Sequence, residues 1–256
     1  MTDMAIELVT TALDYPFPRQ GHSFLFVDGK RLAMDDYSAD GLDKVLAQFG
    51  AAAMAERTAV LAYGANAAPI RLKRKFASQL SGVIFPVIEA RLHNFDIVYA
   101  SHFSSYGALP ATPIPSLGTA VDVAVTYLDR DQLLRMHETE LFHQSYVFGR
   151  LGGIRLVLDT IGLLDSVHSY WSRHGSFTSG CGPLALKAID AEGRRFKAVT
   201  QDAVQRLARD YLAPGCDLNK FIAETASELV ICRERSMALS QVARPFDYSQ
   251  CEILAM

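Results

Sequence analysis

The feature that most constrains the fold is an apolar run that ends in a turn. Residues Thr58–Tyr63 (TAVLAY) are almost all apolar, and they stop at Gly64-Ala65-Asn66. A short continuous run of this kind is typical of a central strand that is buried on both faces. A helix is expected directly after the turn, because Leu72 and Phe76 are four residues apart and Pro69 falls in the first turn, where its missing N–H costs nothing.

This strand–turn–helix segment is a candidate binding site. The first N–H groups of a helix are unpaired and carry about half a positive charge, which suits a carboxylate or a phosphate. Gly64 has no Cβ, so a ligand can approach the backbone closely there. The other interpretation is a purely structural turn in which Asn66 caps the helix.

A second candidate site lies in Asp129–Phe142 (DRDQLLRMHETELF), which has the spacing of a helix. Glu140 falls near the apolar positions Leu133 and Met136, whereas Glu138 falls toward water. A carboxylate held against apolar walls is harder to ionise, so its pKa rises and it can act as a base near neutral pH. The competing interpretation is a solvated glutamate on an amphipathic helix.

The chain divides into three regions, with helices at both ends and strands in the middle. We expect an ancillary N-terminal region (1–55), a core (56–190) and a C-terminal strand and helical extension packed on the core (191–256). In the first region, Asp28-Gly29 signals a hairpin between two helices. This order predicts an α+β fold built on a small, strongly curved mixed sheet or barrel with flanking helices.

Further elements can be placed from pattern and turn signals. They are strands at Phe95–His102 and Ala120–Leu128, a hairpin formed by Leu184–Ile189 and Arg195–Val199, and helices at Gln201–Leu212 and from Leu218 to about Ala238. A Gly/Pro-rich passage, Gly107–Gly118, separates the first two strands. The four residues Asp190–Gly193 are expected to form the turn of the hairpin.

Composition and charge exclude several classes of protein. Half of the 256 residues are hydrophobic and 21% are charged, which is enough apolar material for a packed core and rules out wholesale disorder. The net charge of -3 argues against a nucleic-acid partner, since a protein that binds nucleic acid non-specifically needs a basic surface to contact the phosphates. The basic run Arg71–Lys75 has no interleaved aromatic residues, so we expect a solvated face that helps to attract anionic substrates.

Three observations indicate the compartment. The first residues (MTDMAIELV) have no basic segment, so no signal peptide is expected. The longest uncharged stretch, Ile97–Val121, contains three prolines and several polar residues, which excludes a membrane span. The four cysteines contain no C-x-x-C pair and fit buried thiols in a reducing environment. We therefore expect a cytoplasmic protein without a membrane partner.

Four segments of the chain occur in an order that is found in one known family. YGAN at 63–66 is similar to a Y-G-S-N loop, FDIVYA at 95–100 to an aromatic-bearing strand, and GALPATPIPSLGTAVDVAVTYL at 107–128 to an alanine/proline/glycine passage that leads into a strand. LLRMHETE at 133–140 stands in place of an L-x-x-h-E motif, and Tyr146 follows six residues after its glutamate. Over about residues 56–150, with a weaker similarity to about 190, the sequence resembles the γ-glutamylcyclotransferase-like superfamily.

The resemblance implies an enzyme that cyclises a γ-glutamyl amide to 5-oxoproline and releases an amine or amino acid. This is a transferase or lyase reaction of the kind found in glutathione metabolism, and it needs no cofactor and no metal. The family's catalytic acid/base corresponds to Glu140, and its substrate-binding residues correspond to Tyr63, Gly64, Ala65, Asn66, Ala67 and Tyr146. We then expect the Glu140 carboxylate and the N–H groups of residues 64–67 to face one cavity.

The sequence also departs from the family pattern. Ala65 stands where the family has Ser, and Val123-Ala124 lacks the usual Gly of that strand. Because the loop binds mainly through backbone N–H groups, loss of the Ser hydroxyl is tolerable but can change the choice of substrate. Neither the amine part of the γ-glutamyl substrate nor the oligomeric state follows from the sequence.

Two other functions stay open. The same pocket could serve a non-catalytic module that binds a small carboxylate ligand. Alternatively, His137, Glu140 and His143 could form the metal site of a metal-dependent hydrolase. Positions i and i+6 are about 240° apart on a helix, however, so the two imidazoles do not easily face one ion.

Overall fold

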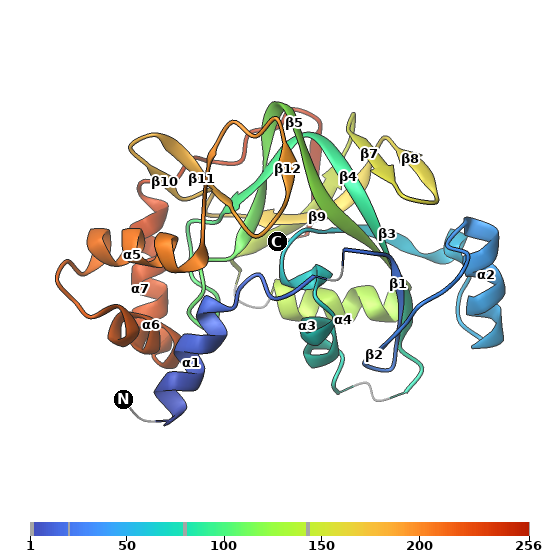
Figure 1. Cartoon of the computed structure of the whole chain (residues 1–256), viewed down its shortest axis with the longest axis horizontal. Helices are drawn as coiled ribbons and strands as arrows, with labels where there is room; N and C mark the ends of the chain where they lie inside the picture. Colours follow the sequence, from blue (N-terminus) through green and yellow to red (C-terminus); the bar gives the residue numbers. More distant parts are fainter. Residues whose placement is uncertain (1–2, 20, 79–80, 142–143, 256) are drawn as a thin grey trace.

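The computed structural model describes residues 3–19, 21–78, 81–141 and 144–255 (Figure 1). The α-helices in these ranges are α1 (Asp3–Leu13), α2 (Ala39–Gln48), α3 (Pro69–Lys75), α4 (Arg130–Glu140), α5 (Gln201–Leu212), α6 (Leu218–Ser227) and α7 (Leu229–Ser240), and the 3-10 turns are η1 (Met54–Glu56) and η2 (Ala65–Ala67). The strands are β1 (Phe24–Val27), β2 (Lys30–Leu32), β3 (Thr58–Ala62), β4 (Ile84–Tyr99), β5 (Ala111–Leu128), β6 (Tyr146–Leu151), β7 (Arg155–Leu158), β8 (Gly162–Leu164), β9 (Val167–Ser172), β10 (Thr178–Ser179), β11 (Gly182–Leu186), β12 (Ala191–Glu192), β13 (Lys197–Val199) and β14 (Cys251–Ala255). No helix within the described ranges is long and apolar enough to span a membrane.

The described strands form one mixed sheet, so the α+β class predicted from the sequence is confirmed. Its main path runs β10-β11-β4-β5-β3-β9-β6-β14 and does not close on itself within the described residues. β3 pairs in parallel with β9, and β11 with β13; β4 and β5 pair antiparallel. The sheet is larger than the small one expected. In Figure 1, α3 and α4 lie below the sheet, and α1, α5, α6 and α7 gather at the left of the view.

The central strand pair, β4 and β5, is longer than the sequence indicated. β5 includes much of the Gly/Pro-rich passage that was expected to separate two strands. The N–H groups of every second residue in a strand point to the same edge. The N–H of Ala111 points away from β4, since it donates to the Tyr15 hydroxyl (2.7 Å). Pro113 and Pro115 follow two and four residues later, so they stand where the pairing with β4 needs no N–H donor.

β4 also begins earlier than predicted, at Ile84 rather than Phe95. The strand contains an irregularity between His93 and Phe95, where Asn94 has a φ of 60°. Asn tolerates this left-handed conformation better than most residues, so the bulge bends the strand without ending it.

The hairpin expected near the N-terminus is present. β1 and β2 pair antiparallel, and the turn residues Asp28 and Gly29 both have positive φ values, as a type I′ turn requires. β1 also pairs with β4, so this hairpin adds to the central sheet. The first helix, α1, packs against α6.

The hairpin expected between residues 184 and 199 is wrong, because β11 and β13 pair in parallel. The segment that connects β11 to β13 crosses to β5, where the short strand β12 pairs with it antiparallel. Arg194 holds the returning chain: it forms an ion pair with the fully buried Asp96 (3.0 Å) and donates to the carbonyl of Ile189 (2.8 Å). The chain therefore re-enters beside β11 in the same direction.

The C-terminal helices differ from the prediction in one respect. α5 has the predicted bounds, whereas the single helix expected from Leu218 to about Ala238 is divided into α6 and α7. The division falls at Glu228, whose backbone is extended (φ -111°, ψ 102°).

Candidate active site

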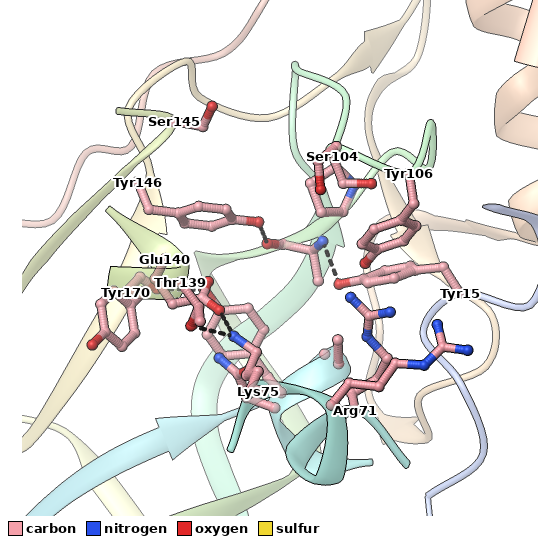
Figure 2. Close-up of a pocket in the computed structure, with 18 of the residues that line it drawn as sticks. Tyr15, Arg71, Lys75, Ser104, Tyr106, Thr139, Glu140, Ser145, Tyr146 and Tyr170 are labelled. Atoms are coloured by element: carbon pink, nitrogen blue, oxygen red, sulfur yellow. Dashed lines mark hydrogen bonds and ion pairs between the residues drawn. The ribbon is translucent and has the colours of Figure 1, made fainter. Parts of the chain in front are cut away.

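One cavity of about 390 Å³ lies between the end of β3, the turn η2, the helices α3 and α4, and the loop after β4 (Figure 2). Strands β6 and β9 and the segment after α1 complete its wall. The lining residues are Tyr15, Leu61, Tyr63, Gly64, Ala65, Asn66, Arg71, Arg74, Lys75, His102, Phe103, Ser104, Ser105, Tyr106, Pro110, Ala111, Arg135, Glu138, Thr139, Glu140, Ser145, Tyr146 and Tyr170.

The turn after β3 offers backbone donors to this cavity. The N–H of Ala67 donates to the carbonyl of Gly64 (3.0 Å), and the N–H of Ala68 donates to the carbonyl of Ala65 (3.1 Å). Within the described residues, no acceptor is found for the N–H groups of Ala65 and Asn66. Ala67 itself is 1% exposed and does not line the cavity, so the structure brings four of the five predicted loop residues to the cavity.

Asn66 does not have the capping role that the sequence suggested. α3 begins at Pro69, and its N-cap residue is Ala68, because the 3-10 turn η2 intervenes. The side-chain oxygen of Asn66 is buried and has no hydrogen-bond partner among the described residues. A buried amide oxygen without a partner is costly, and Asn66 is one of the residues that line the cavity.

The absence of a side chain at Gly64 has a different reason from the one expected. A Cβ at this position would overlap the hydroxyl of Tyr15 and lie 3.3 Å from the Cβ of Ala111. Tyr15 is fixed there because its hydroxyl accepts the hydrogen bond from Ala111 N–H. The space beside Gly64 is therefore filled by the protein's own tyrosine rather than left open for a ligand.

Glu140 lies at the end of α4 and forms an ion pair with Lys75 from α3, drawn as a dashed line in Figure 2. The two side chains are 15% and 10% exposed. Lys75 Nζ also donates to the hydroxyl of Thr139 (3.0 Å). Burial lowers the pKa of the Lys75 ammonium, and the charge of Glu140 opposes that shift. Glu140 is thus directed inward, as expected, but its immediate environment is a cation rather than an apolar wall.

Glu138, expected to face water away from the site, also lines the cavity. Its side chain is 65% exposed and forms an ion pair with Arg135 (2.7 Å). The Nε of Arg135 donates in turn to the backbone carbonyl of Lys75 (2.7 Å). Glu138 therefore lies at the rim, where solvent competes for its charge.

Tyrosine side chains form much of the remaining wall. The hydroxyl of Tyr63 donates to the backbone carbonyl of Tyr170, and that of Tyr146 donates to the carbonyl of Ala111 (2.9 Å). Burial raises the pKa of both phenols above the ordinary value and raises the pKa of Tyr106 to about 12. These hydroxyls are consequently neutral near pH 7, and Tyr63 and Tyr146 are engaged by the backbone.

The metal-site hypothesis gains no support from the described residues. His143 lies outside them. His137 shares a hydrogen bond between its Nδ1 and the hydroxyl of Tyr170 (2.8 Å), and no group of three His, Cys, Asp or Glu side chains that could hold a metal ion occurs in the part of the chain that the structure describes.

Sequence reasoning missed Tyr15, Arg71 and Lys75. The basic run at 71–75 was interpreted as a solvated face, which holds for the exposed Lys73 and Arg74. Arg71 and Lys75 are four residues apart and so project from the same side of α3, into the cavity. That spacing was the available signal. No signal in the sequence places Tyr15 at the site.

Comparisons with known proteins add little to this geometry. No protein-family model matches the sequence, and no curated protein matches it significantly. Among solved structures, a chain described as gamma-glutamyl cyclotransferase is similar at 15% identity with a TM-score of 0.37, over 76% of this chain and 92% of that chain. A second, an uncharacterized protein from Homo sapiens, is 17% identical with a TM-score of 0.36 over the same shares. At these values the similarity carries no conclusion about what this protein does.

Proposed function

We propose that the protein cyclises a γ-glutamyl amide to 5-oxoproline and releases an amine, with Glu140 as the general acid/base. The observation that carries the proposal is that a largely buried carboxylate, Glu140, and the turn residues Ala65 and Asn66, whose N–H groups have no acceptor among the described residues, line one cavity. The N–H groups of Ala65 and Asn66 suit the α-carboxylate of the substrate, and Glu140 suits its α-ammonium.

The proposed reaction needs little beyond orientation and proton transfer. Glu140 removes a proton from the α-ammonium, and the α-nitrogen then attacks the γ-carbonyl carbon of the same molecule. The new C–N bond closes the five-membered ring, the leaving nitrogen takes this proton from Glu140, and the original amide C–N bond breaks. The ring nitrogen then gives its second proton to Glu140, which passes it to the released amine, so that 5-oxoproline and an ammonium leave and the carboxylate is restored. Intramolecular attack in a well-oriented conformer reaches effective molarities on the order of 10⁵ M and above.

Lys75 has a definite place in this scheme. It offsets the cost of burying the Glu140 carboxylate, and its second hydrogen bond, to Thr139, fixes the position of its ammonium between α3 and α4. We assign Lys75 a positioning role, since its ion pair holds Glu140 at the end of α4 where the carboxylate faces the cavity.

A panel of γ-glutamyl compounds tests the proposal. The purified protein would be incubated with a γ-glutamyl amino acid, glutathione and a γ-glutamyl alkylamine, and 5-oxoproline would be quantified by mass spectrometry against a heat-denatured sample. We expect release above the spontaneous rate from at least one compound. No release from any of them would exclude this activity.

A carboxylate-binding module without turnover is the second candidate, and the Lys75–Glu140 ion pair favours it. A carboxylate already paired with an internal ammonium resembles a structural ion pair as much as a free base. Calorimetric binding of a γ-glutamyl compound, together with its complete recovery after long incubation, would identify this function.

A further inference from the structure

The cavity has an unequal charge balance. Four cationic side chains line it, from Arg71, Arg74, Lys75 and Arg135, but only two carboxylates do. Lys75 pairs with Glu140, and Arg135 pairs with Glu138. No carboxylate of the described residues lies within ion-pair distance of Arg71.

Arg71 is held in place by aromatic rings rather than by an anion. The centre of its guanidinium lies 4.8 Å from the ring centroid of Phe17 and 4.4 Å from that of Tyr106. Its Nε is buried and has no acceptor among the described residues. A buried Nε–H without an acceptor is costly unless an acceptor arrives from outside, and the planar donor edge of a guanidinium fits a carboxylate in two parallel hydrogen bonds.

The position of Arg71 separates it from the proposed reaction centre. Arg71 and Lys75 project from the same side of α3, one turn apart, and Arg71 contributes to the lowered pKa of Lys75. In Figure 2, Glu140 and Thr139 lie on one side of Lys75, whereas Arg71 lies on the other side beside Tyr15 and Tyr106. A ligand whose α-ammonium meets Glu140 can therefore extend its distal part toward Arg71.

We propose that Arg71, which packs on the adjoining rings of Phe17 and Tyr106, binds a carboxylate on the part of the substrate that leaves as the amine. The proposal rests on the proposed cyclisation and narrows its substrate to γ-glutamyl compounds whose amine part is itself an acid. Phe17 belongs to the region before residue 56. The proposal therefore also gives that region a function, which is to shape the subsite for the leaving group.

A matched pair of substrates isolates this carboxylate. γ-Glutamyl-alanine and γ-glutamyl-ethylamine differ only in the carboxylate of the leaving part, and kcat/KM for 5-oxoproline release would be measured for both. We expect the wild-type protein to prefer γ-glutamyl-alanine by about 10–100-fold, the worth of a charge-assisted hydrogen-bonded pair. Arg71→Met should remove that preference, so kcat/KM should fall about 10–100-fold more for γ-glutamyl-alanine than for γ-glutamyl-ethylamine, and Arg71→Lys should retain part of the preference.

The control is Lys73→Gln, which removes an exposed cation from the same helix outside the cavity and should leave the preference unchanged. Equal loss with both substrates in Arg71→Met would mean that Arg71 binds the γ-glutamyl end, and equal wild-type rates would mean that no such subsite exists. Either result overturns the inference and leaves the cyclisation standing.

If neither compound is cyclised, the proposed function fails. The affinities of the two compounds for Glu140→Gln protein would then decide the subsite: a preference that Arg71 confers supports it, and no preference overturns it.

Discussion

Lys75 and Glu140 form an ion pair that joins α3 to α4 inside the cavity. α3 follows directly from the turn η2, whereas α4 follows β5, so the pair connects two segments that are 65 residues apart in the chain. The turn η2 and Glu140 both contribute to the lining of this cavity. This arrangement accounts for how a substrate's α-carboxylate and α-ammonium could be bound together.

Replacement of Lys75 tests that arrangement. Lys75→Met leaves the carboxylate without its cation, so the folded state should lose up to about 3 kcal/mol in the free energy of unfolding by urea. kcat for 5-oxoproline release should fall more than KM changes, because the carboxylate is no longer held at its place in the cavity. Lys75→Arg should restore most of both. A variant with lower stability but unchanged kcat and KM would show that Lys75 is only structural.

The contact between Gly64 and Tyr15 predicts a specific rescue. Gly64→Ala should destabilise the protein by about 1–3 kcal/mol, since its methyl group overlaps the Tyr15 hydroxyl. Tyr15→Phe removes that hydroxyl, at the cost of an unpaired Ala111 N–H. The double variant should therefore be more stable than the sum of the two single losses, by thermal or urea unfolding. Strictly additive losses would contradict the proposed contact.

Buried His102 should make the protein sensitive to acid. Burial lowers the pKa of His102 to about 3 from 6.5, and its Nδ1 lies 3.1 Å from the Ser172 hydroxyl. Below pH 6.5 His102 binds a proton in the unfolded chain but stays neutral in the folded one. The contribution of His102 to the free energy of unfolding is therefore complete above pH 6.5 and is lost as the pH falls toward 3.

The corresponding variant gives the magnitude. By pH 5 the loss due to His102 amounts to about 2 kcal/mol. The free energy of unfolding of His102→Gln should accordingly fall less than that of the wild-type protein between pH 7 and pH 5, by about that amount. Parallel pH dependences for the two proteins would show that His102 does not titrate in this way.

The sequence predicted the strand–turn–helix segment and the inward direction of Glu140, because both depend on local periodicity and turn chemistry. It did not predict that β5 includes Pro113 and Pro115, since their tolerance depends on which edge of the strand needs N–H donors. The partners of the site were missed for a related reason. Tyr15 reaches the cavity through packing between distant segments, which no local pattern records, and the ion pair of Lys75 with Glu140 joins two helices whose packing the sequence does not show.

The roles assigned to Tyr63, Gly64, Ala65, Asn66 and Tyr146 stay predictions, although the structure places all five in the lining of the cavity. Ala67 is the exception, because its N–H is used within the turn. Activity measurements are needed to separate a binding pocket from a catalytic one, since both require the same geometry.

The most direct test of the central claim is the rate of 5-oxoproline release by Glu140→Gln. Gln has nearly the same shape and still accepts a hydrogen bond from Lys75, but it cannot take a proton from the α-ammonium. Turnover should fall by about 10²–10⁴-fold, the usual worth of a positioned general base, while the affinity for the substrate changes much less. Asp131→Asn, on an exposed position of the same helix, is the matched control and should keep wild-type activity. A folded Glu140→Gln protein that releases 5-oxoproline at a near-normal rate, or a Glu138→Gln protein that proves to be the inactive one, would contradict the assignment.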